Sequence, residues 1–213
     1  DIEAVGFVYG ARGINAVVTY GEAVVDNSGD IYVGSIYADA IGIYAYSAAG
    51  DASVHNSGAI DVISVEGLAD GIVASGAAVE VGNSGALTVD GATWAAGIEA
   101  QGSDSVSVNN SGDITASAQS FYSGTYYSFE YYNDGVNDPT TTINEGSAYV
   151  RGGYVAGIYA TAGTGGAQVD NSGNITVDGG YAAFGIQVES GGDATVNNSG
   201  DIVVGSATTN STS

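Results

Sequence analysis

The stretch Val-Asn-Asn-Ser-Gly-Asp-Ile occurs at Val108–Ile114 and again at Val196–Ile202, and it decides the fold of this 213-residue chain. Its central Asn-Ser-Gly recurs along the chain, and a related Asn-Glu-Gly falls within the one interval that is roughly doubled. Together they give seven copies, with the asparagines Asn27, Asn56, Asn83, Asn110, Asn144, Asn171 and Asn198. A period of about 27 residues indicates a solenoid in which each copy forms one coil.

Aliphatic residues alternate with polar residues around each asparagine, as Val108, Ile114 and Ala116 do around Asn110. A Gly-Ile pair precedes the asparagine at a nearly constant offset in the six clear copies, as Gly97-Ile98 precedes Asn110. Alternation with period two places the aliphatic residues on one face of a short strand. Each copy therefore predicts three short strands that can bury this face only by stacking on the next copy, about 4.8 Å away. We predict an all-β parallel β-helix, a β-solenoid of about seven coils, that forms a single domain over residues 1–213.

The asparagines are predicted to form a ladder along one corner of the solenoid, each side chain bonding to its equivalent in the next coil. The glycine two residues later allows the backbone to turn there. Asn-Ser-Gly could instead be only a turn-forming sequence, but one residue type at one register favours the ladder. The flanking columns agree with a parallel register, because neither places two acids in adjacent copies, where like charges would repel.

Charge excludes several classes of partner. The chain has 24 acidic residues against Arg12 and Arg151, which gives a net charge of −22. Such a surface repels nucleic acid and anionic membranes, and no segment approaches the length of apolar sequence that a membrane span needs. Without cysteine there are no disulfides and no thiol ligands. We expect no cofactor and no metal site, although the acidic surface could bind calcium weakly.

Residues 117–134 interrupt the repeat with an aromatic-rich loop insertion that contains Phe121, Tyr122, Tyr126, Tyr127, Phe129, Tyr131 and Tyr132. Aromatic rings stack on sugar faces or become buried in a partner. The loop is therefore a candidate ligand site or lateral contact; the alternative is that it folds against its own β-helix. We interpret the other outward aromatics as scattered surface residues: Tyr32, Tyr37, Tyr44, Tyr46 and Trp94.

Catalytic residues are not predicted. A polysaccharide lyase needs a basic residue at its site, and the two arginines lie in different copies of the repeat. A hydrolase needs two carboxylates across a groove. The acids are dispersed, apart from a trio beside the insertion that we interpret as a solvated loop: Glu130, Asp134 and Asp138. His55, the single histidine, takes an outward position that is otherwise often Asp or Asn. We expect that the protein is not an enzyme.

The two quoted runs, together with Ala-x-Gly-Ile-x-Ala at Ala95–Ala100, resemble the passenger regions of bacterial autotransporters and filamentous-haemagglutinin-like adhesins. The resemblance covers essentially the whole chain. It implies a β-helix exported to the cell surface that acts as an adhesin stalk or as a subunit of an extracellular filament, with a surface glycan or receptor as its partner. Because many β-helices act on polysaccharides, binding or cleavage of a polysaccharide is the alternative.

The two ends of the chain share one phase of the repeat, since Asp1-Ile2 matches Asp201-Ile202. A polar tail, residues 205–213, follows the last strand. Unpaired strand edges at the ends of a solenoid can pair with another chain. Two explanations follow: the chain is a piece of a longer passenger, or copies stack into a head-to-tail homopolymer with contacts at Asp1, Ile2, Ile202 and Val204. The net charge of −22 opposes this assembly, and calcium or low pH should promote it.

Overall fold

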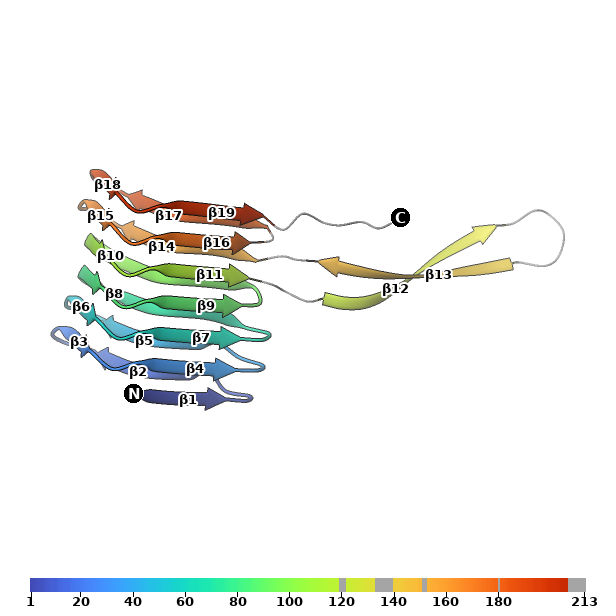
Figure 1. The fold of residues 1–213 in the computed structure, drawn as a ribbon, viewed down its shortest axis with the longest axis horizontal. Helices are drawn as coiled ribbons and strands as arrows, with labels where there is room; N and C mark the ends of the chain where they lie inside the picture. The colour runs from blue at the N-terminus through green and yellow to red at the C-terminus, as the bar shows by residue number, and fades with distance from the viewer. Residues whose placement is uncertain (119–121, 133–139, 151–152, 180, 207–213) are drawn as a thin grey trace.

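The computed structural model describes residues 1–118, 122–132, 140–150, 153–179 and 181–206, and within 122–150 it describes only the backbone strands. Every regular element among these residues is a β-strand. The strands stack as successive coils (Figure 1). In this described part of the chain, no helix is long and apolar enough to cross a membrane.

A seven-stranded parallel sheet forms one face of the stack. Its strands, in spatial order, are β1 (Ile2–Gly6), β4 (Ile31–Ser35), β7 (Ile60–Ser64), β9 (Leu87–Gly91), β11 (Ile114–Ala118), β16 (Ile175–Gly179) and β19 (Ile202–Ser206). Equivalent residues of the repeat pair in register, so that the aliphatic residue after each corner forms one buried column: Ile31, Ile60, Leu87, Ile114 and Ile175.

A ten-stranded parallel sheet forms the other two faces. The first of these faces contains β2 (Ala11–Val18), β5 (Ala40–Ser47), β8 (Leu68–Asn83), β10 (Trp94–Asn110), β14 (Tyr154–Ala162) and β17 (Ala182–Ser190). The second contains β3 (Ala23–Asn27), β6 (Ala52–Asn56), β15 (Ala167–Asn171), β18 (Ala194–Asn198) and the far halves of β8 and β10. The predicted parallel β-solenoid with three strand segments in each coil is therefore confirmed.

The segment around Asn144 departs from the prediction. β12 (Tyr122–Tyr132) and β13 (Thr140–Val150) form a separate antiparallel two-stranded sheet, in which Asn144 lies opposite Ser128. β11 pairs directly with β16 across this insertion. Assigning Asn144 to a coil was therefore wrong, and the stack has six complete coils plus β1. The physical reason lies in the residues that flank it, because Thr142 and Ala148 replace the Val and Ile that other copies bury.

A glycine column bends the strands of the first face. A Cβ on Gly42 would lie 2.4 Å from Ile60 Cγ2 in the core, so this position points inward. The next residue, Ile43, is also fully buried in the core. Two successive inward positions break the alternation of a flat strand. Each strand therefore bends at the glycine, and the outer surface is concave just before it.

Candidate functional site

The concave outer surface is a crease that runs along the stack. Its floor is the column immediately before the glycines, which consists of Arg12, Ile41, Asp70, Ala96, Ala156 and Phe184. These residues alternate with inward neighbours, so they face outward. The middle four are nevertheless buried, although the apolar ones among them do not belong to the core cluster. We call this surface the crease.

Aromatic side chains stand on both walls of the crease at β10 and β14. Trp94 and Tyr154 pair in register on one wall, and Tyr159 pairs with Glu99 on the other. The floor column between them contains Ala96 and Ala156. A cavity of about 240 Å³ opens above the small side chain of Ala156, with Phe184 and Gln187 also in its lining. We call this cavity the aromatic pocket.

The rings of the aromatic pocket are packed against one another. The Trp94 and Tyr159 centroids lie 6.0 Å apart with an interplanar angle of 80°, an edge-to-face pair. Tyr154 packs against Tyr181 at 5.1 Å and 59°. Edge-to-face pairs of this kind contribute about 0.5–1.5 kcal/mol beyond the area they bury. The walls of the pocket are therefore held in place by contacts among its own side chains.

A buried carboxyl lies under Trp94. Asp70, on β8, is only 3% exposed, and its Oδ1 accepts a hydrogen bond of 2.9 Å from the Trp94 indole Nε1. Burial, the charge of Glu99 and the charge of Asp39 raise its pKa to about 8, against the opposing hydrogen bonds from the Trp94 side chain and the Ala96 backbone. β5, β8 and β10 contain no lysine or arginine that could offset these acids. The Asp70 carboxyl is therefore mostly protonated at pH 7.

Glu99 is a second carboxyl, on the wall opposite Trp94, between Val73 and Tyr159 in register. Burial raises its pKa, and a hydrogen bond from the Gln101 amide opposes the rise. The lining of the aromatic pocket itself combines ring faces with the amide of Gln187. Arg12, the one cation whose side chain the structure describes, lies at the β2 end of the crease, where its guanidinium is 4.3 Å from the Tyr44 ring centroid. Tyr44 in turn stacks on Tyr46.

The predicted asparagine ladder is confirmed for six members. All six donate from Nδ2 to the carbonyl of the glycine two residues ahead, and the first five also donate to the Oδ1 of the next asparagine, as Asn83 does to Gly85 at 2.9 Å and to Asn110 at 2.7 Å. Asn110 donates directly to Asn171 at 2.7 Å, across the insertion that contains Asn144. The ladder is structural, because its central members are buried.

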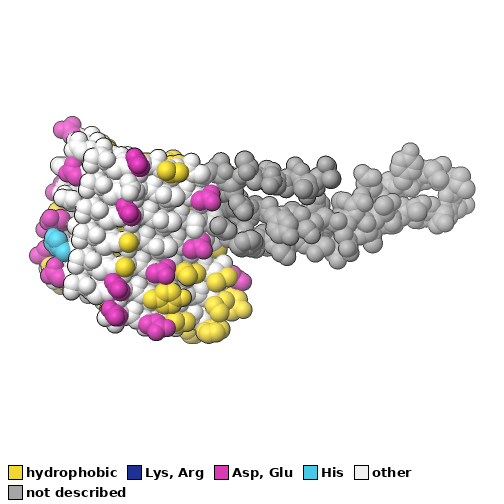
Figure 2. All heavy atoms as spheres, in the orientation of Figure 1, with side chains coloured by type: hydrophobic (Ala, Val, Ile, Leu, Met, Phe, Trp, Pro, Cys, Tyr) yellow, Lys and Arg dark blue, Asp and Glu magenta, His cyan; other side chains and the backbone are white. Residues whose placement is uncertain are grey.

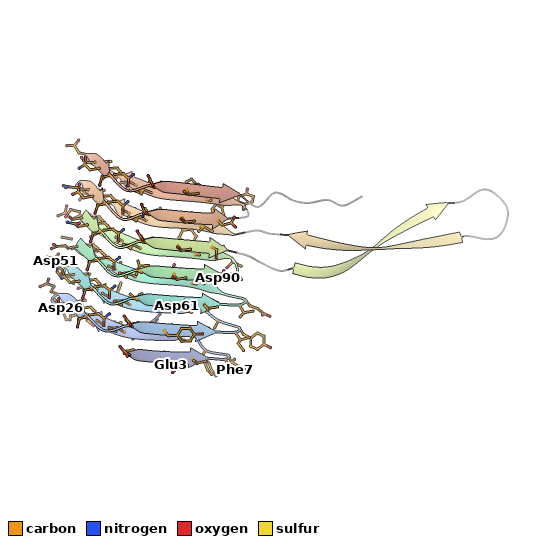
Figure 3. All side chains as sticks on the ribbon, in the orientation of Figure 1. Glu3, Phe7, Asp26, Asp51, Asp61 and Asp90 are labelled. Carbon is orange, nitrogen blue, oxygen red and sulfur yellow. The ribbon has the colours of Figure 1, made fainter. Side chains whose placement is uncertain are left out.

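The predicted aromatic site of the insertion lies where the structure describes no side chains. Phe121 lies outside the described residues, and the other six aromatics lie on β12, whose side chains are not described: Tyr122, Tyr126, Tyr127, Phe129, Tyr131 and Tyr132. The insertion follows β11 at the corner where earlier coils carry exposed apolar side chains, including Phe7, Tyr9 and Tyr37. Phe7 is labelled at this corner in Figure 3. A role in lateral contact remains a prediction.

The predicted end contacts lie at opposite ends of the stack. Asp1 precedes β1, Ile2 begins it, and Ile202 and Val204 belong to β19. Ile2 and Ile202 occupy the same inward column of the seven-stranded sheet, through Ile31 and Ile175. An end-to-end contact through these residues remains a prediction.

Acidic side chains are spread over the surface instead of gathering at one point (Figure 2). Glu3, Asp61 and Asp90 belong to different coils, as do Asp26 and Asp51 (Figure 3). Among the side chains that the structure describes, no group of three or more His, Cys, Asp or Glu could hold a metal ion. His55 lies 3.5 Å from Asp26 at an exposed position.

Sequence reasoning did not find the aromatic pocket. Trp94 was interpreted as a scattered surface residue, whereas it lies at the centre of a packed cluster. A usable signal was that Trp94 and Tyr154 both stand three residues before the glycine of their copies, with alanine before each glycine. No known protein family, curated protein or solved structure matches this chain, so the resemblance to autotransporter passengers remains a prediction.

Proposed function

We propose that this chain is an adhesive β-solenoid of the cell surface whose aromatic pocket binds a single sugar ring. The observation that carries the proposal is the pair of aromatic walls, Trp94 with Tyr154 and Tyr159, above a floor of alanine. Apolar ring faces beside acceptor groups suit a sugar, which presents a C–H face and hydroxyl edges. The remainder of the stack serves as a rigid support.

The dimensions of the pocket support one ring and not an extended chain. Its volume of about 240 Å³ lies below the ~300–1,000 Å³ typical of sites for drug-sized ligands. The Gln187 amide in the lining can both donate and accept hydrogen bonds. The net charge of −22 disfavours acidic sugars. We therefore propose a neutral or amino sugar as the ligand class.

The proposal is tested on a glycan array that includes neutral hexoses, N-acetylhexosamines and uronic acids. Tyr159→Ala and Trp94→Ala each remove one wall and should weaken binding about tenfold or more, equivalent to ~1.4 kcal/mol. Tyr37→Ala is the matched control, because it removes an exposed aromatic outside the pocket. Equal binding by all three variants and the wild type would place the site elsewhere, and failure of the wild type to bind any sugar would refute the proposal.

A second candidate is a filament of end-to-end copies. What supports it is the repeated register of the described coils, in which the strands of the seven-stranded sheet present the same inward columns from β1 to β19. β1 of a second copy could pair with β19 in the register that β19 uses with β16. The seven-stranded sheet has one strand more than either face of the ten-stranded sheet. Pairing β1 with β19 would therefore leave a gap of one strand at the junction on each of those two faces.

Electron microscopy of the purified chain, with and without calcium, tests the filament. Long fibres with an axial spacing of about 4.8 Å would support end-to-end stacking. An Ile202→Asp variant should then form short rods only, because it places a charge in the column that a second copy would cover. Dispersed rods of the wild type under every condition would refute the filament and leave the aromatic pocket as the functional feature.

A further inference from the structure

We infer that Asp70 is a positioning residue, whose buried carboxyl holds the indole of Trp94 in place as a wall of the aromatic pocket. The contact between the two side chains does not depend on any ligand. Its consequence for sugar binding rests on the proposed function of the pocket.

The geometry gives Trp94 two fixed contacts. Its register partner on β8 is Leu68, whereas its indole reaches Asp70, two residues further along that strand. The ring therefore leans across the crease toward the floor. Tyr159 packs edge-to-face against the indole from the next coil. Asp70 thus fixes the nitrogen edge of the indole, and Tyr159 limits the movement of the ring toward the pocket.

Burial shields the hydrogen bond between Asp70 and Trp94 from water. Asp70 is 3% exposed, so water competes little for its carboxyl, and an indole N–H in such a place normally has a partner. Asp70 stands on the outer face of the strand, in a column that is otherwise aliphatic or alanine in the neighbouring coils: Ile41 and Ala96. Packing alone would not require an acid there. The hydrogen bond to Trp94 accounts for it.

The surroundings of Asp70 favour its protonated form. The charged groups that act on it are Glu99 on β10 and Asp39 in the turn before β5, and both are acids. The other titratable side chains of β5 are Tyr44 and Tyr46. The pKa of about 8 means that the carboxyl loses its proton just above neutral pH. Ionisation places a second negative charge beside Glu99 in a buried crease, which burial disfavours. The hydrogen bond from the indole favours the ionised form, because a carboxylate accepts more strongly than a neutral carboxyl group.

Trp94 is the only tryptophan in the chain, so its fluorescence reports directly on this contact without any ligand. Titration from pH 6 to 9.5 should change the wild-type emission with a midpoint near 8, because ionisation of Asp70 places a charge against the indole nitrogen. Asp70→Asn keeps an acceptor for the indole and cannot ionise, so its emission should not change. Asp70→Leu removes the acceptor, so its emission should lie at a longer wavelength than that of the wild type and should not change with pH, with circular dichroism confirming that both variants fold.

Sugar binding supplies the second readout. Asp70→Leu leaves the indole without its acceptor, so affinity for the sugar found on the array should fall about tenfold, equivalent to ~1.4 kcal/mol. Asp70→Asn keeps an acceptor and should bind the sugar like the wild type at pH 7. A fluorescence transition without any bound sugar would refute the proposed function and keep the positioning role. Sugar binding by Asp70→Leu equal to that of the wild type, or a fluorescence transition that persists in Asp70→Asn, would overturn the inference.

Discussion

Asp70 lowers the free energy of unfolding as pH rises, which is the opposite of the usual effect of an aspartate. In the unfolded chain its carboxyl ionises near 3.8, and in the folded chain near 8. Between these values the folded state holds a proton that the unfolded state has released. The free energy of unfolding therefore falls as pH rises from about 4 to about 8. The total fall from this one group is on the order of 5 kcal/mol.

Asp70→Asn should remove this pH dependence, because the amide stays neutral in both states. We expect the variant to match the wild type near pH 4 and to be more stable by several kcal/mol at pH 9. Urea unfolding at pH 4, 7 and 9 measures the difference. If the two proteins lose stability in parallel across this range, Asp70 is not the group whose proton is lost.

Asn83 tests the ladder at the level of one side chain. It accepts from Asn56 at 2.8 Å and donates to Asn110 at 2.7 Å. Asn83→Ala leaves a buried donor and a buried acceptor without partners, each at a cost of about 1–3 kcal/mol. We expect a loss of roughly 3 kcal/mol in urea unfolding. The control variant Asn109→Ala changes an exposed neighbour in the same repeat, so its free energy of unfolding should fall only slightly. Equal falls in the two variants would mean that the ladder does not stabilise the fold.

At the scale of elements, the insertion between β11 and β14 is separable from the stack. β11 already pairs with β16, and β10 with β14, so no coil depends on β12 or β13 for its strand pairing. The preceding coil joins β9 to β10 through only two residues, Ala92 and Thr93. Deletion of residues 119–151 leaves Gly152 and Gly153 as a turn of equal length.

The deletion variant should therefore fold with unchanged circular dichroism and a melting temperature close to that of the wild type. Binding to the glycan array should also survive if the aromatic pocket is the site, and should vanish if the aromatics of residues 117–134 are the site. A deletion variant that does not fold would show that the insertion covers apolar surface of the solenoid, the alternative interpretation of its sequence.

The repeat was predictable because each coil buries the same columns, so that Ile60, Leu87 and Ile114 appear in the sequence at one offset. The insertion was predicted at residues 117–134, but its extension past Asn144 was not, because Asn144-Glu145-Gly146 imitates the corner motif while its flanking residues lack the aliphatic pattern. The crease was not predictable either. Alternation correctly assigns Asp70 to the outer face, but only the bend at the following glycine buries that outer position.

For the whole molecule, the dominant unfavourable feature is its charge of −22, spread over a stack with about 4.8 Å between coils. The sequence separates acids within some columns, yet the total repulsion remains and opposes the compact state. Burial of the aliphatic columns must exceed it. Salt reduces repulsion between exposed charges, since the screening length falls from about 30 Å at 0.01 M to about 10 Å at 0.1 M.

The melting temperature at pH 7 should therefore rise when sodium chloride increases from 10 to about 150 mM, where the screening length is about 8 Å. The same increase in salt at pH 4, where many exposed carboxyls are close to their ordinary pKa values, should have a smaller effect because less charge remains to be screened. Asp70→Asn should show the same salt response as the wild type at pH 7, since its carboxyl is mostly protonated there. A melting temperature that does not change with salt at pH 7 would mean that the spacing of the acids along the columns already removes the repulsion. Charge would then not oppose end-to-end assembly either.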